Sequence, residues 1–88
     1  MITLRLDEIA AIVGGRLADA TGAEVITGNV EFDSRKVASG DLFVALSGVK
    51  VDGHDYAATA MDQGAAGVLA ARPVGVPAVI VPPATEVD

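Results

Sequence analysis

The chain has 88 residues, which is room for one small domain. Hydrophobic residues make up 51% of it and aromatic residues only 3%, so we expect a closely packed core of Ala, Val, Leu and Ile. No apolar run approaches the roughly 20 residues that a membrane span needs, so no membrane partner is expected. The formal net charge of −6 argues against nucleic acid as a partner.

The cysteine and histidine counts restrict the chemistry further. The chain has no cysteine and one histidine, which excludes disulfides and leaves no plausible zinc site. Asp7 and Glu8 stand where a secretory signal would have its apolar segment, so we expect no signal peptide. These features predict a cytoplasmic chain that holds no metal itself.

The first predicted element is a short helix over residues 6–13, ended by Gly14-Gly15, which allow a positive φ. Residues 16–18 form a candidate strand, and residues 19–24 are predicted to be a loop. Apolar residues recur in the helix at a spacing that predicts one buried face: Leu6, Ile9, Ile12 and Val13.

Residues 25–33 are rich in β-branched side chains and alternate weakly in polarity. Gly28-Asn29 in the middle indicates either a bulge or a turn between two shorter strands. In the second half, strand alternation predicts that Val30 and Phe32 face the core and that Glu31 faces solvent.

The second half of the chain predicts a strand–helix–strand unit. Residues 42–46 are an unbroken apolar run, as in a strand buried on both faces. A helix is expected to begin near Asp52 or Gly53, with Asp52 as a suitable N-cap, and to lead to strands over residues 66–71 and 78–81. The predicted class is α/β, with a small mixed sheet of about four to five strands, two helices and one βαβ unit.

Catalytic signatures are absent from the sequence. It contains neither Gly-x-x-x-x-Gly-Lys-Ser/Thr nor Gly-x-Gly-x-x-Gly. Ser34 has no histidine at an obvious partner position, which argues against a nucleophilic triad. We therefore expect this chain to bind a ligand rather than to catalyse a reaction.

Asp33, Ser34 and Arg35 follow the strand predicted before them. The Ser34 hydroxyl can donate and accept, which suits a base edge such as that of uracil, or a diphosphate oxygen; alternatively it caps its own loop. In an extended chain the side chains of Asp33 and Arg35 diverge. Asp33 can then tie down the turn around Gly40, while Arg35 is either a solvated charge or a two-pronged donor to phosphate.

A second loop runs from Gly48 to Asp52. Val49 and Val51 can sandwich a flat base, and Lys50 can meet a diphosphate or be a plain surface lysine. Beyond this loop, His54 is expected to pack or to cap a helix rather than to act in catalysis. Phe43 and Tyr56 are expected in the core.

These stretches resemble the N-terminal domain of the Mur ligases, the ATP-dependent enzymes that extend the peptide of the bacterial cell-wall precursor. The resemblance covers nearly all of the chain. It rests on Asp33-Ser34-Arg35, Gly40-Asp41-Leu42-Phe43-Val44-Ala45-Leu46, Gly48, Asp52-Gly53-His54 and Gly64-Ala65. The opening, residues 8–15, looks most like the branch that adds D-alanyl-D-alanine to UDP-N-acetylmuramoyl-tripeptide.

The resemblance implies that residues 1–82 are a UDP-binding domain and that residues 83–88 begin a linker to central and C-terminal domains absent here. ATP and Mg²⁺ would act in those domains, which would also take D-alanyl-D-alanine. In the family, the serine of Asp-Ser-Arg contacts the UDP part of the substrate, and in the related tripeptide-forming ligases the backbone of the second loop reads the base. The residues implied for this role are Ser34, Arg35, Val49, Lys50, Val51 and Asp52.

Two alternatives stay open. One is the same domain of the branch that adds the third peptide residue, a diamino acid or lysine. The other is a non-catalytic interaction domain whose exposed sheet edge pairs with a partner.

Overall fold

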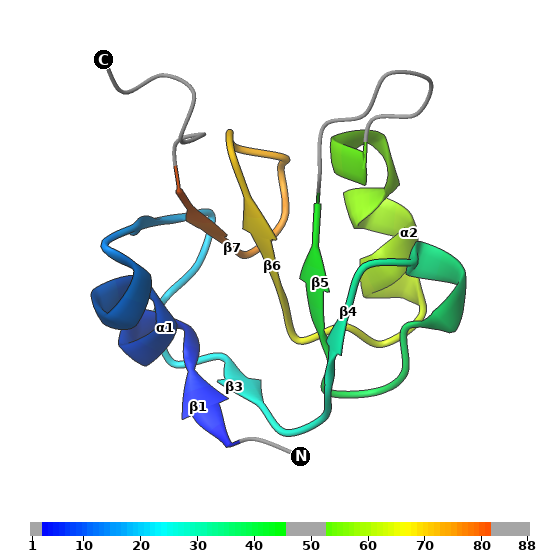
Figure 1. The fold of residues 1–88 in the computed structure, drawn as a ribbon, viewed down its shortest axis with the longest axis horizontal. Helices are drawn as coiled ribbons and strands as arrows, with labels where there is room; N and C mark the ends of the chain where they lie inside the picture. The colour runs from blue at the N-terminus through cyan, green and yellow to red at the C-terminus, as the bar shows by residue number, and fades with distance from the viewer. Residues whose placement is uncertain (1–2, 46–52, 82–88) are drawn as a thin grey trace.

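The computed structural model describes residues 3–45 and 53–81. The chain alternates short strands with two helices and two 3₁₀ turns, called η1 and η2 (Figure 1). In order these are β1 (Leu4–Arg5), α1 (Leu6–Val13), β2 (Arg16–Ala18), β3 (Val25–Ile26), β4 (Val30–Glu31), η1 (Ser34–Lys36), β5 (Leu42–Val44), η2 (Gly53–Tyr56), α2 (Ala57–Asp62), β6 (Gly67–Ala70) and β7 (Ala78–Ile80).

Five strands form one mixed sheet in the order β2-β7-β6-β5-β4. Strands β4, β5, β6 and β7 are parallel to one another, and β2 runs antiparallel to β7. Strands β1 and β3 form a separate antiparallel pair. Because β5 and β6 are parallel neighbours joined through α2, they make the predicted βαβ unit, and the α/β class with a five-stranded mixed sheet is confirmed.

The sheet is covered on both faces, by α1 on one side and by α2 on the other (Figure 1). Alternate residues of each inner strand therefore enter different cores: Val68 packs with α2, whereas Leu69 packs with α1. In β7, Ala78 and Ile80 join the α2 side and Val79 joins the α1 side. This two-sided burial explains why these strands are continuous apolar runs.

Helix α1 has the predicted bounds, but its buried face is narrower than predicted. Leu6, Ile9 and Ala10 are buried, while Ile12 is 71% exposed and Val13 is 40% exposed. At 3.6 residues per turn, position 12 is rotated about 120° from position 6 and so points away from the sheet. Val13 lies in the last turn, where the chain leaves the helix. The prediction that these two side chains are core residues is therefore wrong.

Strand β4 shows a second difference. The turn predicted at Gly28-Asn29 is present, since β3 and β4 are separate short strands in different sheets. Val30 is 47% exposed and Phe32 is 60% exposed, so the prediction that both face the core is wrong. The reason is that β4 is the last strand of its sheet and has only 2 residues. The Glu31 carboxylate folds back onto the main chain and accepts the Phe32 N–H at 3.1 Å.

Gly14 and Gly15 provide a test of this packing. Gly14 has a left-handed φ of 70° and open space around it, whereas a Cβ on Gly15 would lie 2.7 Å from the Ile80 carbonyl oxygen. Asn tolerates the left-handed conformation, so we expect Gly14→Asn to change stability little. Gly15→Asn should lower the free energy of unfolding by about 1–3 kcal/mol. Urea denaturation measures both, and equal losses would contradict this account.

Candidate functional site

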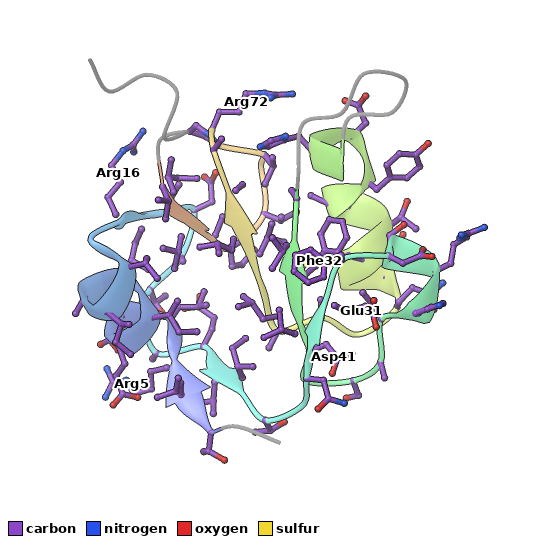
Figure 2. All side chains as sticks on the ribbon, in the orientation of Figure 1. Arg5, Arg16, Glu31, Phe32, Asp41 and Arg72 are labelled. Carbon is purple, nitrogen blue, oxygen red and sulfur yellow. The ribbon has the colours of Figure 1, made fainter. Side chains whose placement is uncertain are left out.

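The site is a cavity of about 440 Å³ beside β5, where β4 gives way to η1. Ligands in open α/β sheets bind outside the carboxyl ends of the strands, and this cavity lies past the end of β4. Figure 2 shows Phe32 following β4 at this place. Three segments line it: the residues after β4, the middle of β5, and η2. The lining residues are Phe32, Asp33, Ser34, Arg35, Phe43, Gly53 and Tyr56.

The turn η1 holds Ser34 in the cavity wall. The Asp33 carboxylate caps this turn by accepting the backbone N–H of Arg35 at 2.9 Å, and the Asp33 carbonyl accepts that of Lys36 at 2.9 Å. Capping therefore falls to Asp33 rather than to Ser34, which was the alternative role considered for the serine. Ser34 is 8% exposed and is one of the residues that line the cavity.

Asp33 and Arg35 form an ion pair within this turn. Arg35 Nε donates to Asp33 Oδ1 at 3.0 Å, and Arg35 Nη2 donates to Oδ2 at 2.8 Å. The prediction that the two side chains diverge is wrong, because η1 is a 3₁₀ turn and not an extended chain. One edge of the guanidinium is thus occupied by a carboxylate. The Arg35 side chain is 85% exposed. Because its charge is balanced by that of Asp33, the pair carries no net charge at the cavity rim.

The ion pair changes the acidity of both groups. Hydrogen bonds from the Arg35 side chain and then from its backbone N–H lower the pKa of Asp33 from 3.8 to about 2. The same carboxylate raises the pKa of Arg35. Asp33 is therefore ionised throughout the physiological range and does not serve as a proton donor.

The turn around Gly40 is tied down by Asp41, so the prediction that Asp33 does this is wrong. Asp41 is 4% exposed. Its carboxylate accepts the backbone N–H of Asn29 at 2.8 Å and of Ala38 at 2.9 Å. A carboxylate placed directly before an unbroken apolar strand was the sequence signal that could have identified it.

Three aromatic residues line the cavity, and none was predicted there because all three were expected in the core. Phe43, at 1% exposed, is a core residue as predicted, but Tyr56 is 41% exposed and lines the cavity together with Phe32. His54 is buried, and its Nε2 accepts the Ala71 backbone N–H at 3.0 Å, which fits the packing role predicted for it.

The remaining predicted site residues, Val49, Lys50, Val51 and Asp52, lie outside the described residues, as does the expected linker over 83–88. Of the predicted set, the structure thus brings Ser34 and Arg35 together at one cavity. Within residues 3–45 and 53–81, no group of three or more His, Cys, Asp or Glu side chains could hold a metal ion. In the same part of the chain, no helix is long and apolar enough to cross a membrane.

Comparison with known proteins identifies the family. The family model described as "Mur ligase family, catalytic domain" matches residues 26–87. The chain therefore belongs to the Mur ligase family, as its motifs indicated. The fold agrees: a crystal structure of MurF from Acinetobacter baumannii superposes with a TM-score of 0.77 over 92% of this chain and 18% of that one, at 24% identity.

Two curated relatives mark different branches. UDP-N-acetylmuramoyl-tripeptide–D-alanyl-D-alanine ligase of Mycobacterium tuberculosis H37Rv is 56% identical over 87 residues, covering 94% of this chain. UDP-N-acetylmuramoyl-L-alanyl-D-glutamate–2,6-diaminopimelate ligase of Geobacillus kaustophilus is also 56% identical, but over 54 residues and 59% of this chain. The chain spans only 17% of the length of the first relative and 11% of the second.

The ion pair of η1 is open to a direct test. In Arg35→Met, the pKa of Asp33 should rise from about 2 towards its ordinary 3.8, because its main hydrogen-bond donor is gone. Carbon-detected NMR titration of the Asp33 carboxyl measures this. Lys36→Met is the matched control and should leave that pKa close to the wild-type value, since Lys36 acts only weakly on Asp33.

The lowered pKa of Asp33 also predicts that the stability of the folded chain depends on pH. At pH values between the ordinary and the lowered pKa, Asp33 binds fewer protons in the folded chain than in the unfolded chain. The stabilisation is therefore present above pH 3.8 and is lost as the pH falls towards about 2. Arg35→Met should lose less stability over this window. A pKa of Asp33 that stays near 2 in Arg35→Met would show that the ion pair is not the cause.

Proposed function

We propose that this chain is the substrate-anchoring domain of a ligase that joins D-alanyl-D-alanine to UDP-N-acetylmuramoyl-tripeptide, in cytoplasmic synthesis of the peptidoglycan precursor. The domain holds the UDP end of the substrate in the cavity at η1. The observation that carries the proposal is the place of Ser34, a buried hydroxyl in a cavity wall whose loop is capped by another residue. The name and 94% coverage of the Mycobacterium tuberculosis relative support the choice of substrate.

The chemical step belongs to the rest of the proposed enzyme. ATP and Mg²⁺ would activate the carboxylate of the tripeptide for attack by the amine of D-alanyl-D-alanine. Because the sequence has no phosphate-binding loop, we assign both groups to the other domains of the proposed enzyme. The contribution of this domain is binding energy from a part of the substrate remote from the reacting carboxylate, which orients that carboxylate.

The walls of the cavity match the neutral end of such a substrate. Phe32 and Tyr56 offer partly exposed aromatic surface, and the buried ring of Phe43 closes the third side. The Asp33–Arg35 pair adds no net charge. A uridine base offers a flat apolar face together with hydrogen-bonding edges, and Ser34 can both donate to and accept from such an edge. The neighbouring residues Val49 to Asp52 remain part of the proposed site.

A second candidate has a specific observation in its favour. The diaminopimelate-adding relative of Geobacillus kaustophilus matches this chain at 56% identity, although over a shorter stretch. Under this alternative the anchoring role of the cavity is unchanged, and the substrate is the UDP-linked dipeptide that the name of this relative prints. Comparing the affinity for the UDP-linked tripeptide with that for the UDP-linked dipeptide discriminates between the two when the whole enzyme is assayed.

Amide NMR titration of the chain tests the anchoring role. UDP-N-acetylmuramoyl-tripeptide and UDP should both shift the amides of Phe32 to Arg35, and ATP should not. Ser34→Ala should weaken binding about twofold to tenfold, the cost of one neutral hydrogen bond. Ser39→Ala is the matched control, because Ser39 is exposed and does not line the cavity. Shifts that are equal with ATP, or located away from the cavity, would contradict the proposal.

A further inference from the structure

Asp41 is a buried acid that does not line the cavity but binds both ends of the segment that forms it. Its Oδ1 accepts the Asn29 N–H at 2.8 Å, and its Oδ2 accepts the Ala38 N–H at 2.9 Å. Between these two contacts lies segment 30–37, which carries the cavity residues Phe32 to Arg35. One carboxylate therefore closes this segment into a loop, with one oxygen on each end.

The main chain that carries this carboxylate is held by further hydrogen bonds. The Asp41 carbonyl accepts the Ala66 N–H at 2.8 Å, and its own N–H donates to the Ala38 carbonyl at 3.1 Å. Gly28 leaves just enough room, because a Cβ there would lie 2.1 Å from Asp41 Oδ1. Asp41 is 4% exposed, so water does not compete for these contacts. The contact geometry thus fixes segment 30–37 relative to the rest of the sheet.

We propose that Asp41 is a positioning residue for the ligand cavity, holding segment 30–37 so that Ser34 faces the ligand. The inference rests on the proposed function of that cavity. Hydrogen bonds to an ionised acceptor are stronger than those between neutral groups, and a site whose loop is ordered in advance loses less entropy on binding. β4 is a two-residue edge strand, so little else in the sheet fixes this segment.

Asp41→Asn tests the proposal, because the amide keeps the shape but sets an NH₂ donor against one of the two N–H groups. Two measurements are made on the 88-residue chain: amide hydrogen exchange without ligand, and NMR titration with UDP-N-acetylmuramoyl-tripeptide. We expect faster exchange confined to segment 30–37 and about tenfold weaker binding, as for a binding group moved slightly out of place. Asp62→Asn, an exposed acid in α2, is the control and should change neither.

Each outcome decides the proposal. Binding that stays at the wild-type affinity in Asp41→Asn overturns the positioning role, and so does exchange that accelerates equally in β5, β6 and β7. If Asp41→Asn does not fold, Gly28→Ala displaces the same carboxylate from the Asn29 side and should give the same selective pattern. If the wild type does not bind the ligand, the proposed function fails, and the exchange pattern alone decides whether Asp41 orders segment 30–37.

Discussion

Burial of one small sheet on both faces is the constraint on which this structure depends. Each face of the five-stranded sheet is covered by one helix, and the core under α2 consists mostly of Ala and Val. At Gly67, a Cβ would lie 2.8 Å from Leu6 Cδ2, which shows how tightly α1 lies on the sheet. On the opposite side, the small side chains of Ala57 and Ala60 let α2 approach closely as well.

The cavity forms where this constraint relaxes. Strand β4 is the last of the sheet, has one neighbour, and ends after 2 residues. The chain beyond it is not held by a second strand. Side-chain contacts from Asp33 and Asp41 shape it, together with packing of Val37 on the α2 side of the core. The two acids have separate roles, because one shapes the turn that carries Ser34 and the other secures the base of the whole segment. The sheet thus provides the support, and two carboxylates shape the segment that lines the cavity.

Much of the fold could be predicted from the sequence because two-sided burial leaves a plain pattern. The apolar runs of β5, β6 and β7 and the glycine at the end of α1 placed those elements within a residue or two of their observed bounds. The errors lie where burial depends on neighbours that are distant in sequence. Ile12 and Phe32 look like core residues by type and spacing, but α1 exposes one and the edge of the sheet exposes the other.

Part of the cavity lining was predicted for the same reason. Ser34 and Arg35 carry a recognisable motif, and the structure places both at the cavity. The pairing of Arg35 with Asp33 depends on a 3₁₀ turn that side-chain type alone did not indicate, and the role of Asp41 depends on contacts up to 12 residues away. Pattern reasoning finds residues that repeat a motif; it does not find a residue whose importance lies in joining two separate segments.

The position of Tyr56 has a practical consequence. The sequence contains one tyrosine and no tryptophan, and that tyrosine lies on the wall of the cavity. Near-ultraviolet circular dichroism of the tyrosine band therefore reports on one place in the molecule, and the place is the site itself. The chain carries an intrinsic optical probe at its cavity, so the ordering of that wall can be followed without a label.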